Sequence, residues 1–212
     1  MNSPEIPKYT DEHLRTLADL NRLQLLGQDH VLDFNVEDLI ESMGITVEPF
    51  ANLASEYKVE AIPVFADNSI RVDEEAYNCV EEWFGRLRFT LMHELAHFIL
   101  HKDHLAERNF KTIAEWARFV RTVETERSVI EEQANEFAGR FLVPVDRLRL
   151  MIPEERDKLL EIHGTISQFD LIRYTAVRLG KKFNVSPTAI KVRIRKEKLQ
   201  KLFWKNTSHL SE

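Results

Sequence analysis

A short segment near the middle of the chain has the residue types and spacing of a metal-binding motif. His93 and His97 are four positions apart, and Glu94 follows the first of them, within RLRFTLMHELAHFILH at residues 86–101. Residues four apart share one helix face with Cβ atoms about 5–6 Å apart, so both imidazoles can reach one zinc ion. This HExxH pattern predicts His93 and His97 as ligands and Glu94 beside them. The alternative is an ordinary histidine pair on an amphipathic helix.

A third ligand is needed, because catalytic zinc is held by three protein groups and keeps one open position. The segment VIEEQANEFAGRFLVP at residues 129–144 has a helical apolar stripe, with Glu131 and Asn135 four apart at its edge. Glu131 could bind the ion, while Asn135 could hydrogen-bond the far nitrogen of a ligand histidine and fix its tautomer. Glu132 points about 100° away and is the weaker choice. Alternatively, the two glutamates merely complement the helix dipole.

The elements before these motifs predict a small sheet among helices. A helix through residues 14–26 ends at Gly27, and a second begins after Asn35 and stops at Gly44. Residues 45–50 alternate like a short strand. Residues 59–65 and 69–72 predict a hairpin around a turn at 66–68, with Pro63 confining its strand to a sheet edge or a bulge.

Most of the remaining chain has helical periodicity, so the expected fold class is α+β and mostly helical. The helices are expected at residues 74–83, 86–101, 113–123 and 129–143, with more in the C-terminal part. We expect two domains, residues 1–150 and a C-terminal helical segment at 151–212. Trp116, Phe119 and Val120 could form a lid or partner surface, although such residues are more often local core.

Composition directs the search for chemistry to histidine and carboxylate side chains. The chain has 212 residues, of which 43% are apolar and 30% charged, so a sizeable core can form. The single cysteine, Cys79, excludes a disulfide framework and any site built from several thiolates. The N-terminus lacks the layout of a signal peptide, and no apolar run reaches about 18 residues. A soluble cytoplasmic protein is therefore expected.

The formal net charge of -6 is an average over two very different regions. Residues 173–205 contain eleven Lys or Arg and one acid, a balance of +10, which leaves -16 for the rest of the chain. Phosphate binding requires clustered bases, so only this basic tail could contact nucleic acid.

The basic tail has a pattern similar to a helix-turn-helix unit. Residues 171–179 indicate one helix and residues 183–185 a tight turn, and a second helix starts with Ser186 as N-cap and Pro187 at its first position. This second helix would present Thr188, Lys191, Arg193 and Arg195. DNA contact through residues 171–205 is one interpretation. The other, which we favour, is packing on the acidic body or docking of a partner.

Together, HELAHFILH preceded by RFT and the acidic Ala-Asn, Phe-Ala helix ending in Leu-Val-Pro resemble the ImmA/IrrE family of zinc metallopeptidase-like proteins. The resemblance covers roughly residues 11–150, although the charged stretch at 102–128 is longer than it leads us to expect. It implies a minimal zincin fold and a cytoplasmic zinc metalloprotease. It also implies the ligands His93, His97 and Glu131, the catalytic Glu94, and Asn135 as support for a ligand histidine.

The expected function is that of a zinc-dependent endopeptidase, with Glu94 taking a proton from the attacking water. Members of the family are known for cleaving helix-turn-helix repressors, so such a regulator is the expected substrate. The alternatives are a non-catalytic regulator or toxin–antitoxin partner on a zincin scaffold, binding protein or DNA through its tail, and a metal-dependent hydrolase of other substrates.

Some site roles stay open at this point. His101 lies one turn beyond His97 on the same face and could support a ligand, face the substrate, or act as a helix C-terminal cation. The donor that stabilises the oxyanion could be His101, His104, Tyr57 or Tyr174 by residue type.

Overall fold

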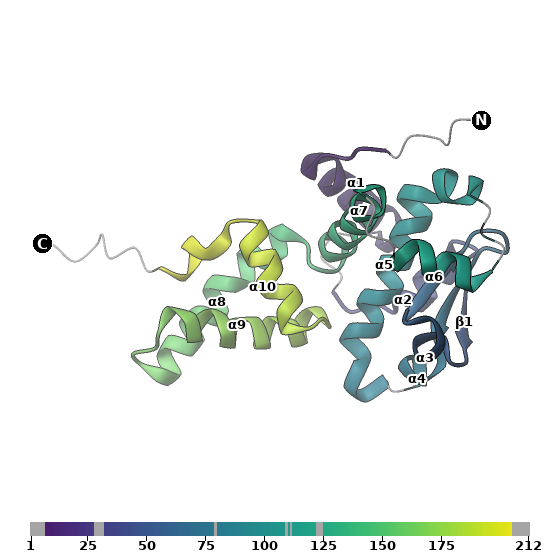
Figure 1. Cartoon of the computed structure of the whole chain (residues 1–212). Helices are drawn as coiled ribbons and strands as arrows, with labels where there is room; N and C mark the ends of the chain where they lie inside the picture. Colours follow the sequence, from purple (N-terminus) through teal and green to yellow (C-terminus); the bar gives the residue numbers. More distant parts are fainter. Residues whose placement is uncertain are drawn as a thin grey trace, which may run out of the picture. The chain divides into compact units, whose positions relative to one another are not determined.

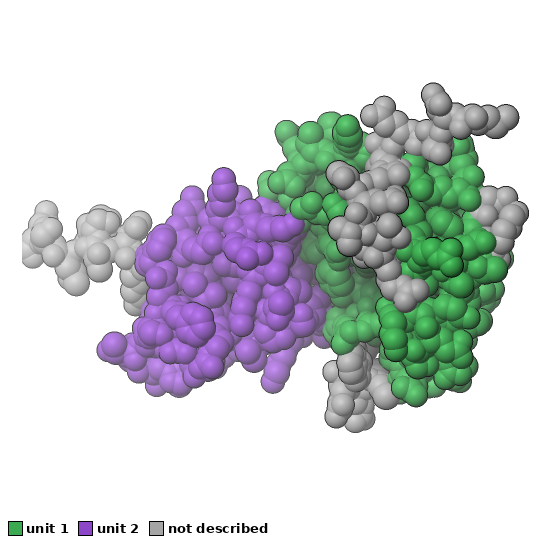
Figure 2. All heavy atoms as spheres, in the orientation of Figure 1, with its two compact units in different colours: residues 1–141 green, residues 142–212 purple. Residues whose placement is uncertain are grey.

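The computed structural model describes residues 7–27, 32–78, 80–108, 110, 112–121 and 125–204, so Cys79 and Lys205 lie outside the described residues. The chain forms two compact units, Met1–Phe141 and Leu142–Glu212, called unit 1 and unit 2 below (Figure 2). The boundary expected from the sequence, between residues 150 and 151, falls inside a helix of unit 2.

Unit 1 combines helices with a three-stranded sheet, which makes the fold class α+β and mostly helical (Figure 1). Its elements are α1 (Asp11–Leu26), α2 (Val36–Ser42), β1 (Thr46–Phe50), α3 (Leu53–Tyr57), β2 (Ala61–Val64), β3 (Ser69–Asp73), α4 (Glu74–Asn78), α5 (Val80–Glu107), α6 (Ile113–Arg121) and α7 (Thr125–Leu142), the last reaching one residue past the boundary.

The first two helices begin and end as their residues predict. The Asn35 side chain accepts a hydrogen bond from the amide of Glu37, which satisfies one of the free N–H groups at the start of α2. Gly27 ends α1 with a φ of 71°, a left-handed conformation that costs glycine little because it has no Cβ.

The sheet has the strand order β1-β3-β2. The predicted hairpin is confirmed, since β2 pairs antiparallel with β3 and places Pro63 opposite Ile70. β2 is an edge strand, which suits a residue that has no N–H to donate. The sequence did not predict that β1 pairs in parallel with β3, from Thr46 opposite Ser69 to Phe50 opposite Asp73.

The metal-binding motif lies within a single long helix. α5 spans 28 residues and includes the whole predicted helix at 86–101. The other expected helix, at 74–83, is helical on both sides of Cys79, as α4 up to Asn78 and as α5 from Val80, while Cys79 itself lies outside the described residues. No proline interrupts residues 80–107, so nothing in this stretch forces a helix to end.

Unit 1 has an apolar cluster between its sheet and α6. Trp116 is 5% exposed and packs with Ile62, Leu105 and Ile130, while Phe119 contacts the cluster from a partly buried position. The expectation that Trp116 and Phe119 are local core is therefore confirmed. The Val120 side chain lies outside the described part of the structure.

Unit 2 is entirely helical in its described residues and consists of α8 (Val145–His163), α9 (Gln168–Phe183), α10 (Pro187–Lys196) and the 3-10 helix η1 (Leu199–Phe203). The predicted turn is present. Asn184 ends α9 in a left-handed conformation, and the Ser186 hydroxyl accepts a hydrogen bond from the Ala189 amide at the start of α10. Among the described residues of the whole chain, no helix is both long and apolar enough to cross a membrane.

Candidate metal centre

Two helices of unit 1 bring the three predicted ligands together. The Nε2 atoms of His93 and His97, both on α5, are 3.1 Å apart. Glu131 on α7 places Oε2 3.3 Å from Nε2 of His93 and Oε1 3.7 Å from Nε2 of His97. All of these ligand atoms lie within 4.8 Å of one another, so the group can hold a metal ion.

The spacing of the donor atoms fits zinc. Ligands about 2.0–2.1 Å from a tetrahedral ion are separated from each other by about 3.3–3.4 Å. The two ring nitrogens are 3.1 Å apart, and the nearest carboxylate oxygens lie 3.3 Å from His93 (Oε2) and 3.7 Å from His97 (Oε1), so these separations scatter around this value. Two imidazoles and one carboxylate are also a ligand set typical of catalytic zinc, which leaves a fourth position for water or substrate.

Asn135 is placed to orient the first ligand. Its Oδ1 lies 3.2 Å from Nδ1 of His93. An amide oxygen can only accept, so Nδ1 of His93 carries the proton in this contact and Nε2 keeps the lone pair that a metal needs. The structure thus brings Asn135 next to His93, one of the predicted ligands, as the spacing on the predicted helices indicated.

Glu94 is buried beside the two histidines, with 6% of its surface exposed. Burial is the largest influence on its carboxyl and raises the pKa to about 7, while His93 lowers it and Glu131 raises it further. A carboxyl that titrates near neutrality can both accept and return a proton, which general acid–base chemistry requires.

The two ligand histidines differ in their tendency to take up a proton. Burial lowers the pKa of His97 well below its usual value, and the neighbouring His93 and His101 lower it further. Burial also opposes a charge on His93, but the hydrogen bond that the charged ring donates to Glu131 and the charges of Glu94 and Glu131 outweigh it, so the pKa of His93 is raised. A metal ion held by this group would therefore compete with a proton mainly at His93.

Comparison with known families identifies the relatives of this chain. The family model Peptidase_M78, described as the IrrE N-terminal-like domain, matches residues 85–195, just over half of the chain. The chain belongs to this family. The match starts in α5, includes all the residues of the candidate metal centre and extends to α10, further towards the C-terminus than the expected zincin region.

Membership places the chain in a zincin-like protease family. A comparison with curated proteins gives no match. Among solved structures, a Mycobacterium tuberculosis transcriptional regulator is similar, with a TM-score of 0.48 and 15% identity, over 88% of this chain and 52% of that chain. The chain therefore spans about half the length of that regulator.

In this IrrE-like chain His101 does not face a substrate, which corrects one of the roles left open by the sequence. Its side chain is fully buried, with Nδ1 3.1 Å from Nδ1 of His97 and Nε2 2.8 Å from Oε1 of Gln133. Burial lowers its pKa to about 4, and the hydrogen bond that its ring donates to Oε1 of Gln133 opposes that shift only in part. His101 is therefore neutral at pH 7 and is no helix C-terminal cation.

The sequence did not point to Gln133 as part of the site. It lies two positions from both Glu131 and Asn135, which is about 200° around the helix, so it was not considered with them. The regular spacing of His93, His97 and His101 along α5 is the signal that could have suggested a third polar partner on α7.

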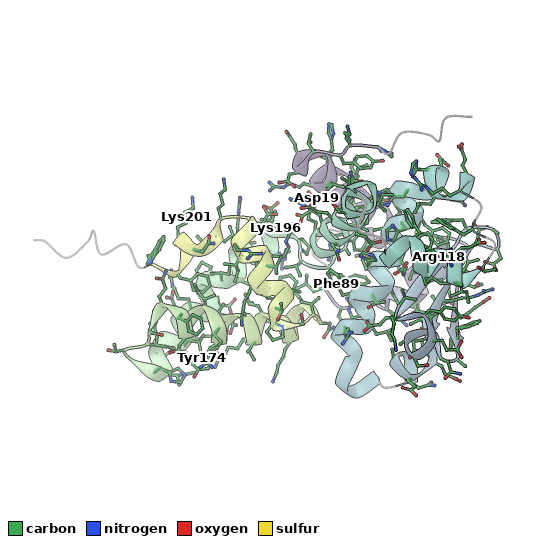
Figure 3. The ribbon with its side chains drawn as sticks, in the orientation of Figure 1. Asp19, Phe89, Arg118, Tyr174, Lys196 and Lys201 are labelled. Atoms are coloured by element: carbon green, nitrogen blue, oxygen red, sulfur yellow. The ribbon has the colours of Figure 1, made fainter. Side chains whose placement is uncertain are left out.

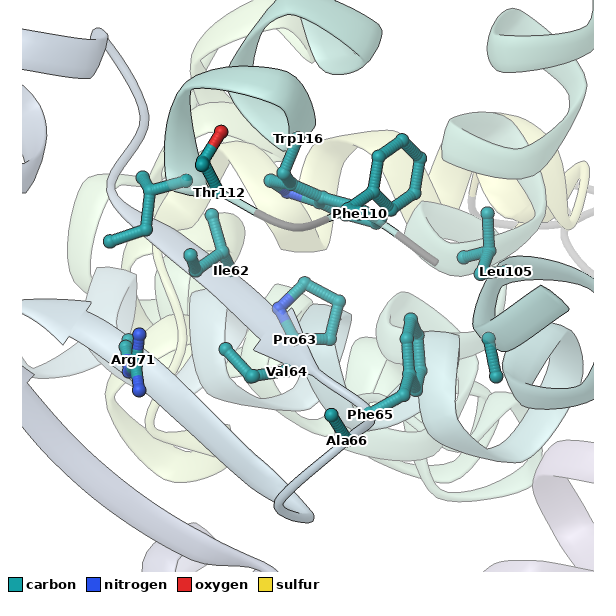
Figure 4. Close-up of a pocket in the computed structure, with 12 residues that line it drawn as sticks. Ile62, Pro63, Val64, Phe65, Ala66, Arg71, Leu105, Phe110, Thr112 and Trp116 are labelled. Carbon is teal, nitrogen blue, oxygen red and sulfur yellow. The ribbon is translucent and has the colours of Figure 1, made fainter. Parts of the chain in front are cut away.

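An apolar pocket lies between β2 and α6 (Figure 4). Its volume is about 190 Å³, and its walls include Ile62 and Val64 from β2 and Phe110 and Trp116 from the opposite side. Trp116 links the pocket to the metal centre, because its ring meets the ring of His97 edge-on with centroids 6.2 Å apart.

The other three side chains considered as oxyanion donors have different surroundings. Tyr174 belongs to unit 2, where its ring stacks on His163 with centroids 5.8 Å apart. Tyr57 packs against the apolar cluster of unit 1, and His104 is buried in α5.

The basic tail of this family member presents fewer bases than its pattern predicted. Arg193 is 2% exposed and lies 3.9 Å from the carboxylate of Glu197, so it is not on the outer face of α10. Thr188, Lys191 and Arg195 are exposed as expected. Lys196 and Lys201 also lie at the surface of unit 2 (Figure 3).

Proposed function

We propose that this chain is a zinc-dependent endopeptidase. The observation that carries the proposal is the buried carboxyl of Glu94 next to His93 and His97, whose Nε2 atoms converge with Glu131. A site that only stored zinc or stabilised the fold would need the three ligands alone. It would have no use for a further side chain such as Glu94, whose buried carboxyl has a pKa of about 7.

Each side chain has a defined task in this mechanism. His93, His97 and Glu131 would hold the ion, and Asn135 would keep His93 in the tautomer that leaves Nε2 free to bind it. Bound zinc polarises a peptide carbonyl and makes water a stronger acid. Glu94 accepts the proton of the water that attacks the carbonyl carbon, and it then donates this proton to the amine that leaves as the C–N bond breaks.

The substrate proposed here is an extended segment of a regulatory protein, with a helix-turn-helix repressor as the favoured class. That class comes from the family resemblance. The structure adds an edge strand and a pocket: within the described residues β2 pairs with β3 alone, so its other edge can pair with a peptide strand. An apolar side chain of that peptide fits the pocket beside Trp116.

The test is a comparison of the wild type with Glu94→Gln on candidate regulators, with zinc content measured in parallel. We expect Glu94→Gln to keep its zinc and to cleave at least about 10²-fold more slowly, the contribution typical of a general acid–base. Glu132→Gln is the matched control, since Glu132 is an exposed carboxylate on α7 and should change neither quantity. Full activity in Glu94→Gln would exclude the proposed role.

A second candidate function is DNA binding through unit 2. It is supported by the exposed bases Lys191 and Arg195, which lie four apart on one face of α10. Binding of this kind must weaken steeply with added salt, because counterions are released from the phosphates. Titrating the full chain with a labelled duplex at several salt concentrations tests it, and no binding at low salt would remove this candidate.

A further inference from the structure

A chain of hydrogen bonds runs from the ligand His97 away from the metal centre. Nδ1 of His97 lies 3.1 Å from Nδ1 of His101, and Nε2 of His101 lies 2.8 Å from Oε1 of Gln133. The side-chain amide of Gln133 donates in turn to the backbone carbonyl of Pro7 at 2.9 Å. His97, His101 and Gln133 are all buried.

The donor and acceptor of every hydrogen bond in this series follow from its last acceptor, the backbone carbonyl of Pro7. The carbonyl of Pro7 can only accept, so the amide nitrogen of Gln133 must point towards it and Oε1 towards His101. Oε1 also only accepts, so Nε2 of His101 carries that ring's proton. The two Nδ1 atoms face each other at 3.1 Å, so one ring donates to the other; with the proton of His101 on Nε2, its Nδ1 accepts and Nδ1 of His97 donates. Nε2 of His97 is left with a free lone pair.

We propose that His101 and Gln133, anchored on the carbonyl of Pro7, are positioning residues that hold His97 in the tautomer able to bind zinc. The proposal rests on the proposed metal centre, which it deepens: the ligand is prepared before the ion arrives. It also makes the segment before α1 part of the support of the site. Tyr9 strengthens this link, because its hydroxyl donates to the carbonyl of Leu100 on α5 at 3.4 Å.

The support of His97 differs from that of His93 in its access to water. Asn135 is an exposed residue, so water can replace its oxygen behind His93. His101 is fully buried, and losing it would leave Nδ1 of His97 without an acceptor in a place that water does not reach. Removing His101 should therefore cost more zinc affinity than removing Asn135.

The experiment compares His101→Leu with His101→Asn in the full-length protein, with Zn²⁺ as the ligand. Asparagine can place Oδ1 where Nδ1 of the histidine lies, so it keeps the acceptor for His97, whereas leucine removes it. We expect His101→Leu to raise the zinc Kd by about 10–100-fold, the effect typical of lost support behind a metal ligand. His101→Asn should recover most of that loss.

A second readout separates this role from ordinary stabilisation of the fold. The ¹⁵N shifts of the imidazole nitrogens in zinc-free protein report the tautomer directly. We expect His97 to be protonated at Nδ1 in the wild type and to become a mixture of tautomers in His101→Leu. Leu100→Ala is the control, because it removes a buried side chain of α5 outside the hydrogen-bond chain; it should lower Tm and leave both the tautomer and the zinc Kd unchanged.

Two results would overturn the proposal. One is a His97 protonated at Nε2 in zinc-free wild type. The other is that His101→Leu and Leu100→Ala, when they lower Tm by the same amount, also weaken zinc binding by the same factor. If His101→Leu does not fold, Gln133→Met takes its place. It removes the acceptor of His101, and its zinc Kd and its His97 tautomer are compared with those of Leu100→Ala. Neither readout involves cleavage, so a protein that cleaves nothing would refute the proposed peptidase activity and leave this test intact.

Discussion

In the proposed metal centre His93 and His97 would bind the ion through the same ring nitrogen, Nε2, yet the atoms behind them are of different kinds. His93 depends on the carboxamide oxygen of an exposed asparagine, and His97 depends on a buried histidine. A ligand whose far nitrogen is held by a fixed acceptor binds metal better, because its orientation and tautomer are already set.

The first prediction concerns Asn135→Leu. Loss of the acceptor at 3.2 Å from His93 should raise the zinc Kd by about tenfold, the lower end of the range for such partners, because water can take over the hydrogen bond. Competition with a chelating indicator measures it. A larger effect than that of His101→Leu would contradict the expected order of the two supports.

The residues of the candidate metal centre were predicted from helical spacing, which is a local feature of the sequence. His93, Glu94 and His97 lie within one turn of α5, and Glu131 and Asn135 within one turn of α7, so a period of 3.6 was enough to propose them. That α7 lies against α5 at these points depends on tertiary packing. The contacts of Gln133 with His101 and Pro7 join residues 32 and 126 positions apart, and no local pattern signals them.

The turn between α9 and α10 is an element whose geometry depends on one glycine. A Cβ at Gly180 would lie 2.9 Å from the carbonyl oxygen of Val185, a backbone atom that cannot rotate away. The small side chain therefore lets the turn at residues 184–186 fold back close to α9.

The second prediction is that Gly180→Ala destabilises unit 2. Alanine favours a helix by about 1 kcal/mol over glycine, but the clash with the Val185 carbonyl should reverse the sign and cost about 1–3 kcal/mol. Urea unfolding measures the change. Lys181→Ala, at the next and exposed position, is the control and should be neutral or slightly stabilising; a stabilised Gly180→Ala would show that the turn adapts.

The third prediction concerns a buried carboxylate that joins α8 to α9. Glu155 accepts from Lys182 at 2.7 Å and contacts Lys158 and Arg178 at 3.5 and 3.4 Å. Burial alone would raise its pKa, but these three cations outweigh burial and lower it. Glu155→Gln should cost about 1–2 kcal/mol at pH 7, since partly exposed cations are screened by solvent.

This cost should depend on pH in one direction. A carboxyl with a lowered folded-state pKa stabilises the protein above its unfolded value of 4.5 and loses that effect as pH falls through the folded value. The difference between wild type and Glu155→Gln should therefore be full at pH 7 and shrink below about pH 4.5. Glu154→Gln, at an exposed carboxylate beside the same Lys158, should show no measurable change. A difference that does not shrink at all between pH 7 and pH 3 would contradict this interpretation.

Among the elements, those with local start and stop signals were predicted and those without them were not. Gly27, Asn35 and Ser186 occur at helix ends as expected. The parallel pairing of β1 with β3 could not be predicted, because the two strands are separated by α3 and β2 and only the assembled sheet brings them together. The five-residue α3 is too short for its periodicity to be recognised.

At the scale of the whole molecule, metal binding and stability should be linked in one unit only. His93, His97 and Glu131 all belong to unit 1, so zinc favours the folded state of that unit. The fourth prediction is that excess zinc raises the free energy of unfolding of unit 1 by about 2.7 kcal/mol when its concentration is a hundred times Kd. The unfolding transition of unit 1 should move to higher temperature, and that of unit 2 should stay unchanged.

Calorimetry of the full chain with zinc and with a chelator measures this difference. His93→Ala is the control, since removing a ligand should abolish the zinc-dependent shift without changing the transition of unit 2. If zinc raised both transitions equally, the two units would unfold together and the metal would stabilise the whole chain.

The charge pattern suggested a division of the chain, but it placed the boundary differently from the structure. The basic residues cluster from Arg173 onward, whereas unit 2 begins at Leu142 and includes α8, which carries acids such as Glu154 and Glu161 as well as bases. Charge reports which partners a surface attracts, while the boundary of a unit is set by which side chains pack together, so the two need not coincide.

His93 and His97 lie in the middle of α5, more than two turns from either end. Helix ends open readily, but we expect amides at this position, flanked by the buried Leu91, Met92 and Leu95, to exchange with deuterium only when much of unit 1 opens. An ion held at the proposed site should then enter and leave while the protein stays folded, past the partly exposed side chains of His93 and Glu131. We expect the rate of metal exchange to depend on ligand substitution at these two partly exposed side chains, and hardly at all on the unfolding rate.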